Sequence, residues 1–160
     1  MNTLRALSLL GATLTMGFAA GAFALYAHAI LPGLRHTDDR TFVTAFASID
    51  RAIINPWFML TAFLGALVLT AAAAVLNLGR EPLPFVAAAL LAYLVVFVIT
   101  LAVNVPLNDA IKAAGDADPA AAREAFHEAR WAAFNLVRTV LSAGAFAALT
   151  WALVVHGRST

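Results

Sequence analysis

The chain contains no cysteine among its 160 residues. This absence excludes disulfide frameworks, thiolate metal sites and the membrane enzymes that form disulfides through reactive thiols. Charged residues are also scarce, because they make up 12% of the chain against about a quarter in a typical soluble domain. The net charge is only +1, and no basic cluster of the kind that binds nucleic acid is present. The sequence therefore predicts neither a thiol enzyme nor a nucleic-acid partner.

Apolar residues are what the chain has in excess, at 62% of the total and with a mean hydropathy of +0.86. About 20 consecutive apolar residues are enough to cross a bilayer. Short turns between such segments favour antiparallel neighbours. We therefore expect one all-α domain over residues 1–160, an integral membrane antiparallel four-helix bundle. The expected spans cover residues 5–30, 57–78, 84–104 and 131–155.

The first span has a rival interpretation as a signal peptide, with Arg5 as the charged start and residues 27–29 (AHA) as the cleavage site. The apolar run is longer than a signal core of 7–15 residues, so a retained helix is favoured. Gly17 and Gly21 are four residues apart, and this spacing lets another helix approach closely. The pair predicts a homo-oligomer contact, with chance in an Ala/Gly-rich helix as the alternative.

The segments outside the spans are not plain loops. Residues 40–54 predict an amphipathic helix that lies in the membrane interface or over the mouth of the bundle. Asp50 falls on its apolar side, where a carboxylate needs a partner. We expect the first helix to end at Pro32-Gly33 and the third to kink or break at residues 102–105, before Pro106. Residues 119–130 should extend the fourth helix beyond the membrane, unbroken as far as residue 156.

The chain's polar groups gather at one end of this topology. Taking 100° per residue, seven polar or aromatic residues of the last helix fall within roughly a third of its surface: Glu124, His127, Glu128, Trp131, Asn135, Arg138 and Ser142. Antiparallel connectivity adds groups from the other segments at the same end: Tyr26, His28, Asp50, Arg51, Asn55, Trp57, Asn104 and Asn108. The pattern predicts a pocket with an apolar floor for a small lipophilic molecule.

Basic residues are also unequal between the two ends, with seven at the pocket end and three at the end that carries the termini. The positive-inside rule then places the pocket end in the cytoplasm, and we expect a bacterial inner (plasma) membrane.

Arg138 is the costliest of these groups, because an ionised side chain inside a membrane needs a partner and usually marks function. Asp50, Glu124 or an anionic or carbonyl-bearing ligand could supply it, and an ion pair that only clips the loop helix to the fourth span is the structural alternative. His127 is the natural proton carrier, unless it is simply exposed to water. His28 and His127 could instead bind haem or a metal. A Glu-x-x-His motif occurs only once, at Glu124 and His127, so no metal site is predicted.

Four stretches of the chain, taken in order and spacing, resemble a known family. They are residues 31–34 (LPGL), 53–58 (IINPWF), 104–108 (NVPLN) and 131–139 (WAAFNLVRT). They resemble a small four-helix membrane family whose fungal members include anthrone oxygenases and whose bacterial members are mostly of unknown function. The family pattern has an amide pair where this chain has Ser48 and Asp50.

The resemblance implies insertion of oxygen at an activated methylene to give an anthraquinone, with no cofactor. It implies that His127 is the base and that Asn104, Asn135 and Arg138 hold the developing enolate. Binding residues would flank or orient a flat substrate: Trp57, Tyr93 and Trp131, with His28, Asp50 and Asn108 at the same end. Two other functions remain open: a non-enzymatic subunit that binds or transports a lipophilic ligand, and a haem or quinone redox module using His28 and His127.

Overall fold

The computed structural model describes residues 2–114 and 117–158, and these residues form helices and turns with no strand. The α-helices are α1 (Asn2–Leu25), α2 (Leu31–Arg35), α3 (Asp39–Ile53), α4 (Leu64–Leu76), α5 (Leu83–Ile99), α6 (Val105–Ala114), α7 (Pro119–Ala125) and α8 (Glu128–Arg158). Three π-helical segments adjoin these helices: η1 (Tyr26–Ile30) between α1 and α2, η2 (Phe58–Phe63) before α4, and η3 (Thr100–Asn104) between α5 and α6.

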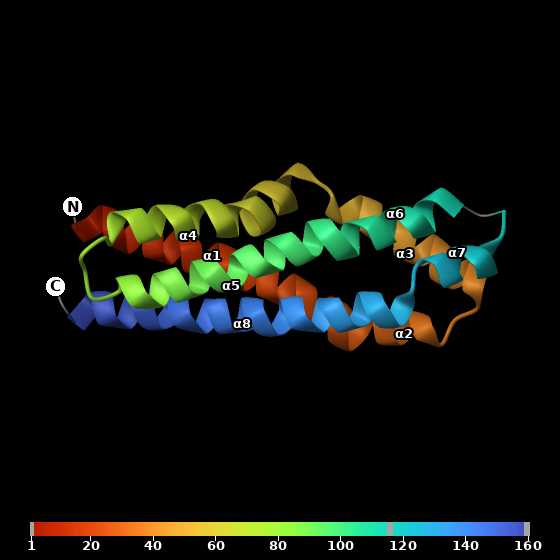
Figure 1. The fold of residues 1–160 in the computed structure, drawn as a ribbon. Helices are drawn as coiled ribbons and strands as arrows, with labels where there is room; N and C mark the ends of the chain where they lie inside the picture. The colour runs from red at the N-terminus through yellow and green to blue at the C-terminus, as the bar shows by residue number, and fades with distance from the viewer. Residues whose placement is uncertain (1, 115–116, 159–160) are drawn as a thin grey trace.

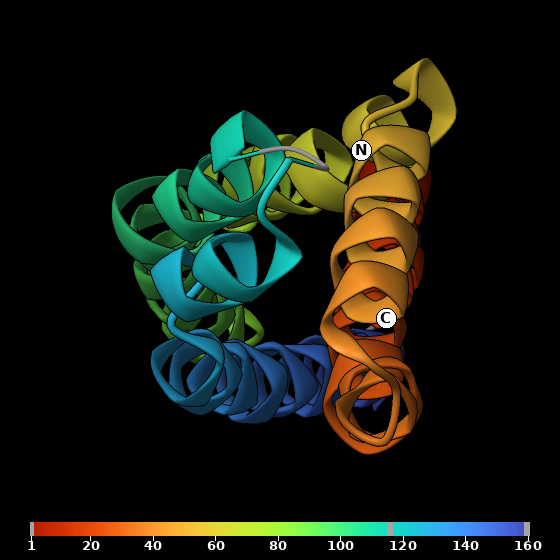
Figure 2. The ribbon, with the colours of Figure 1, turned by 90° about the vertical axis from the view of Figure 1, so that its right-hand side faces the viewer.

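Four helical stretches of the described chain are long and apolar enough to cross a membrane: Asn2–Arg35, Phe58–Leu76, Leu83–Ala113 and Glu128–Arg158. They run lengthwise beside one another, and both termini lie at one end (Figure 1). Helix α1 packs against α4 and α8, while α5 packs against α8 and α4. Seen end-on, the helices surround a common axis (Figure 2). The predicted fold class, an all-α membrane bundle of four spans, is confirmed.

Proline explains where two of the π-helical segments occur. Pro32 and Pro106 each stand two residues after a π-helical segment, η1 and η3 respectively. A proline has no amide N–H for the carbonyl four residues back and its ring crowds that carbonyl, so the helix must adjust locally. Here the adjustment is a wider π-helical turn rather than a break. The expected helix end at Pro32-Gly33 is therefore wrong, and the expected kink at 102–105 is a π-helical turn inside a continuous helix.

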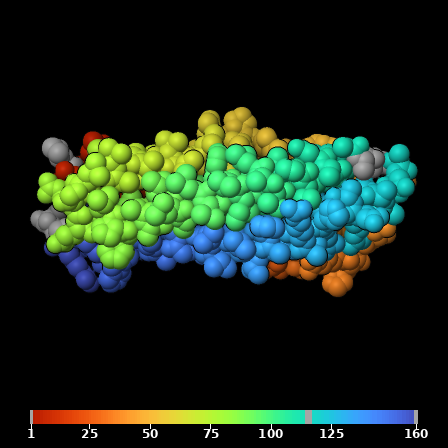
Figure 3. Space-filling model, viewed as in Figure 1, coloured from red at the N-terminus to blue at the C-terminus, as the bar shows by residue number. Residues whose placement is uncertain are grey.

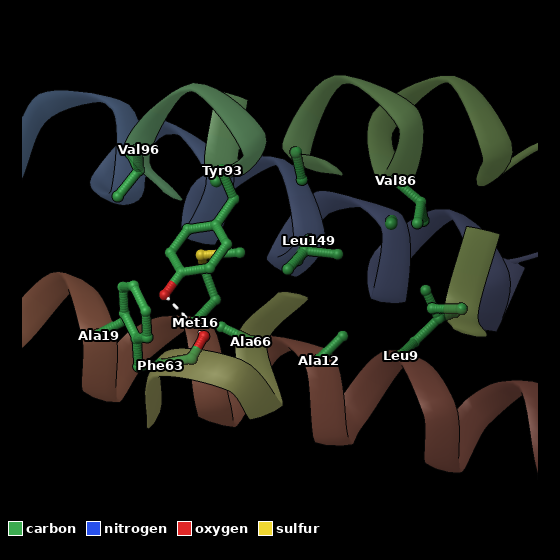
Figure 4. Close-up of a cluster of buried hydrophobic side chains, with 14 of the residues drawn as sticks. Leu9, Ala12, Met16, Ala19, Phe63, Ala66, Val86, Tyr93, Val96 and Leu149 are labelled. Atoms are coloured by element: carbon green, nitrogen blue, oxygen red, sulfur yellow. Dashed lines mark hydrogen bonds between the residues drawn. The ribbon is translucent and has the colours of Figure 1, made fainter. Parts of the chain in front are cut away.

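The apolar core fills the half of the bundle nearer the termini. Small residues alternate there with larger ones, so the helices interlock closely. In Figure 4 the Tyr93 ring crosses this core and its hydroxyl points at the Phe63 carbonyl. That hydroxyl donates a hydrogen bond of 3.0 Å to the carbonyl oxygen, so the polar end of a fully buried ring is satisfied. The bond also ties α5 to η2.

The other end of the bundle is capped by α2, α3, α6 and α7 (Figure 1). Asp38 begins α3 by accepting hydrogen bonds from the Thr41 amide at 3.0 Å and the Thr41 hydroxyl at 2.7 Å. These bonds hold the pKa of the Asp38 carboxyl below its usual value. Asp118 begins α7 in the same way, through the Ala121 amide. Because the bonds favour the ionised carboxylate, the α3 cap is in place at neutral pH and is lost as pH falls through the lowered pKa.

A cluster of aromatic rings holds this cap on the bundle. The Phe46 ring centroid lies 4.5 Å from that of Phe126 and 5.5 Å from that of Trp131. Tyr26 and Phe42 complete the cluster around it. The cluster joins η1, α3 and α8 to the short segment after α7, and the space-filling view shows that end of the molecule as one continuous body (Figure 3).

Replacing Phe46 with alanine should therefore lower the free energy of unfolding by about 3 kcal/mol, because it leaves a cavity at the centre of the ring cluster. Denaturant unfolding of the purified protein in detergent measures this loss. Phe18→Ala is the control, since Phe18 is 51% exposed on the outer face of α1. Equal losses in the two variants would contradict the assigned role of the cluster.

The expected unbroken helix from residue 119 to 156 is wrong. Helix α7 stops at Ala125, and α8 starts at Glu128. Between them His127 has a φ of 47°, in the left-handed region that histidine tolerates better than most side chains. The break sets α7 to one side of the axis of α8, so that α7 lies across the bundle mouth (Figure 2). The ring of Phe126 can then reach the aromatic cluster, which a straight extension would have held away.

Candidate functional site

A pocket of about 200 Å³ lies between the core and the cap. Its walls come from all four spans and from α3. Each π-helical segment contributes to it, η1 through Tyr26, η2 through Met59 and η3 through Thr100. A π-helical turn is wider than an α-helical one, and such turns occur frequently at functional sites. Three of them at one depth leave room between helices that interlock closely elsewhere.

Arg138 reaches this pocket from the middle of α8 and is only 5% exposed. It donates hydrogen bonds to the side-chain oxygen of Asn135 at 2.8 Å and to the Thr100 hydroxyl at 3.3 Å. Its Nε has no hydrogen-bond partner among the described residues. Within that same part of the chain, no carboxylate forms an ion pair with it. A buried cation therefore faces the pocket with its charge uncompensated.

Aromatic faces take the place of a counter-ion. The guanidinium carbon of Arg138 lies 4.5 Å from the centroid of the Phe23 ring and 5.5 Å from that of Trp131. Both rings line the pocket. Cation–π contacts stabilise a buried guanidinium without neutralising it. The arrangement can hold a flat apolar molecule and attract negative charge that develops on one of its oxygens.

The pocket's other polar wall is a chain of hydrogen bonds that begins at Trp131. The indole N–H of Trp131 donates to the Asn108 side-chain oxygen at 2.7 Å, and the Asn108 amide donates to Asp50 at 2.6 Å. The second oxygen of Asp50 pairs with the Lys112 ammonium at 2.8 Å, and that ammonium also reaches Asp109 at 3.0 Å. Asp50 is 4% exposed, so the pocket holds a carboxylate at some distance along the wall from Arg138.

A family model described as anthrone oxygenase matches residues 42–148, a stretch that runs from α3 through most of α8. The chain belongs to the anthrone oxygenase family. This confirms the resemblance that the four sequence motifs indicated. No curated protein and no solved structure matches the chain. The matched range contains Asp50, Asn108, Trp131 and Arg138, so the family region includes both polar walls of the pocket.

Four of the site residues predicted from the sequence line the pocket: Arg138, Trp131, Asn108 and Asp50. Of the three partners considered for Arg138, Asp50 instead pairs with Lys112. No ion pair joins Arg138 to Glu124 among the described residues, and Glu124 is exposed. An anionic or carbonyl-bearing ligand is the partner that the geometry leaves open.

Three further predicted residues support the pocket without lining it. Asn135 holds Arg138 and donates to the Phe23 carbonyl at 3.1 Å. Asn104 donates to the Trp131 carbonyl at 3.3 Å, and its side-chain oxygen is buried without a described partner. Tyr93 is fully buried in the apolar core, on the side of the pocket that is nearer the termini. The predicted polar face of α8 thus lies toward the bundle interior, since Trp131, Asn135, Arg138 and Ser142 are all buried.

The remaining three predicted residues lie away from the pocket. Trp57 is 61% exposed and touches Phe18 on the outside of the bundle. His28 is exposed, and its ring nitrogen bonds to the Ala24 carbonyl. His127 is exposed at the turn before α8. Among the described residues, no group of three histidine, aspartate or glutamate side chains is placed to hold a metal ion.

Sequence reasoning missed Lys112 and Phe23. Lys112 lies on α6, which continues past it to Ala114. A signal was present, because Asn104, Asn108 and Lys112 recur every four residues and so share one helix face. Phe23 carried no signal among the many apolar residues of α1. Gly17, one of the two glycines expected at a homo-oligomer contact, lies under the Phe146 ring of the same chain, while Gly21 has open space around it.

Proposed function

We propose that this protein is a membrane-embedded oxygenase that converts a lipophilic aromatic ketone of the anthrone type to the corresponding quinone without a cofactor. The observation that carries the proposal is the buried guanidinium of Arg138, which faces an apolar pocket with no carboxylate partner among the described residues. Membership of the anthrone oxygenase family supports it.

The chemistry begins with removal of a proton from the methylene carbon of the bound ketone. The electron pair left behind delocalises onto the carbonyl oxygen, and the Arg138 guanidinium stabilises the enolate. The carbanion carbon then bonds to dioxygen, which is reduced to a peroxide and protonated. Loss of the second methylene proton, with cleavage of the O–O bond, releases water and leaves a new carbonyl. One anthrone and one dioxygen become one anthraquinone and one water.

Asp50 is our choice for the base that removes the first proton, because its carboxylate is buried and lines the pocket. Asn108 and Lys112 hold it in place through hydrogen bonds and an ion pair. The family resemblance implies His127 as the base instead, and that assignment remains a prediction that the turnover rates of His127 and Asp50 variants test. Trp131 and Phe23 would lie against the flat substrate, since both rings face the pocket.

Purified protein in liposomes should consume dioxygen when anthrone is added and should form one anthraquinone per dioxygen consumed. An oxygen electrode and absorbance of the quinone measure the two quantities. Liposomes without protein give the uncatalysed rate. Saturable binding of anthrone with no rate above that control would contradict the oxygenase and would favour a protein that only binds or carries a lipophilic ligand.

We further propose that the pocket end faces the cytoplasm of a bacterial inner membrane. Seven of the ten basic residues lie at that end, as the positive-inside rule requires. Short peptide tags at the termini, which lie together at the opposite end (Figure 1), should then be cleaved by protease added from the periplasmic side. Assembly into a homo-oligomer through Gly17 and Gly21 stays a prediction.

A further inference from the structure

Some residues of the Arg138 pocket also lie on the outer surface of the molecule. Ile54 is 59% exposed, Leu101 53% and Val105 37%, and all three line the pocket. Leu101 and Val105 are one turn apart on the third membrane span. Exposed aliphatic side chains on a membrane span face lipid. The pocket therefore has an opening in its lateral wall, on the lipid side.

The backbone explains why the wall is open there. The chain leaves α3 after Ile53, and the segment of residues 54–57 turns outward before η2 begins (Figures 1 and 2). Across the opening, η3 is the π-helical turn placed by Pro106. Two wide π-helical turns thus face each other, while the α-helical parts of the same two spans pack together nearer the termini.

The route from water along the axis of the bundle is covered. The ring cluster of Phe46, Phe126 and Trp131 covers the end of the bundle. Outside it, Arg123 pairs with Asp39 at 2.9 Å and with Glu128 at 3.4 Å. Arg35 of α2 pairs with the same Glu128. A molecule entering along that axis would have to separate these rings and ion pairs, whereas the lateral opening is bordered by the aliphatic Ile54, Leu101 and Val105. The polar Asp109 and Lys112 line the pocket only at its cap end.

We infer that the substrate enters the pocket from the bilayer, through the lateral opening formed by Ile54, Leu101 and Val105. The inference rests on the proposed function, because the occupant is the lipophilic aromatic ketone assigned there. Such a molecule concentrates in the hydrocarbon layer, since burial of its apolar area in lipid is favourable. It can then pass sideways to Arg138 without returning to water.

Narrowing the opening tests this inference, and the chain offers a matched control. Leu101 and Val105 can be replaced together by phenylalanine. Leu91 and Val95 have the same Leu-x-x-x-Val spacing on the same span, are 65% and 48% exposed and do not line the pocket. Binding of anthrone to liposomes carrying each variant is followed under argon by quenching of tryptophan fluorescence, and oxygenation is then measured in air.

The Leu101→Phe, Val105→Phe variant should bind anthrone about 10-fold more slowly than wild type, because such changes act on the association step. It should lose kcat/KM in proportion, with little change in kcat. The Leu91→Phe, Val95→Phe variant should behave as wild type. The widened Leu101→Ala, Val105→Ala variant should bind at least as fast as wild type, which separates narrowing from damage to the fold.

Equal rates in the Leu101/Val105 and Leu91/Val95 phenylalanine variants would overturn the lateral route, as would slower binding in the alanine variant. These outcomes are distinct from failure of the proposed function. If anthrone binds to wild type and binds slowly to the narrowed variant, but is not oxygenated, then the oxygenase fails and the route stands. If wild type oxygenates anthrone and the narrowed variant does so at the same kcat/KM, the route fails and the oxygenase stands.

Discussion

Replacing Arg138 with glutamine should lower kcat/KM for anthrone oxygenation by about 100-fold or more, the usual cost of removing a donor that stabilises a developing oxyanion. The effect is large because the guanidinium is 5% exposed and lies among aromatic rings, where water cannot replace it. Glutamine is polar but uncharged, so the variant removes the charge and the forked donor group together. Oxygen uptake by the variant in liposomes, measured across anthrone concentrations, gives the value.

Arg158→Gln is the matched control for this prediction. Arg158 is on the same helix, at its far end, and its guanidinium carbon also lies over a tryptophan ring, 5.7 Å from the centroid of Trp151. It is exposed, so its loss should leave kcat/KM near the wild-type value. Arg138→Lys should fall between, since an ammonium keeps the charge but not the flat, forked donor geometry. A wild-type rate in Arg138→Gln would remove the basis of the proposed mechanism.

Replacing Asp50 with asparagine should lower kcat by about 100-fold, because a positioned base typically contributes 10²–10⁴ to the rate of a proton transfer. Asparagine has the same shape and can still accept the hydrogen bond from Asn108, so the pocket should keep its form. Anthrone binding under argon should therefore stay within a few-fold of wild type. A loss of kcat with binding preserved is the signature of a missing proton acceptor.

His127→Gln separates the two candidate bases. If Asp50 is the base, this variant should oxygenate anthrone at close to the wild-type rate, since His127 is exposed and does not line the pocket. If instead His127→Gln loses turnover and Asp50→Asn keeps it, then the role implied by the family resemblance is correct and Asp50 only binds. Asp109→Asn, at the exposed end of the same ion-pair group, controls for a simple change of charge near Lys112.

The polar face of α8 could be predicted because helical periodicity is a local property. Residues at 131, 135, 138 and 142 share one face on any α-helix, and a buried arginine had to face the bundle interior rather than lipid. The segment 119–127 could not be predicted in the same way. Its composition favours helix throughout, and the break at His127 follows from the burial of Phe126 against Phe46, a contact between residues 80 positions apart.

The placement of Asp50 in the pocket shows the same limit. Sequence reasoning favoured His127 because histidine most readily exchanges protons near neutral pH, and placed Asp50 among the binding residues. Whether a side chain reaches a pocket depends on where two separate helices meet, and no local pattern contains that information. Lys112 was missed for the related reason that its partner, Asp50, lies 62 residues earlier in the chain.

The sequence by itself determined the class of the protein: apolar runs of spanning length impose four membrane helices, and the order of the motifs assigns the family. Only the tertiary structure decided where the pocket is and what faces it. Prolines in two spans, Pro32 and Pro106, could have produced kinks, breaks or wide turns. They produced wide turns at one depth because packing against neighbouring helices holds each span continuous, and that shared depth is what leaves Arg138 beside an opening toward lipid.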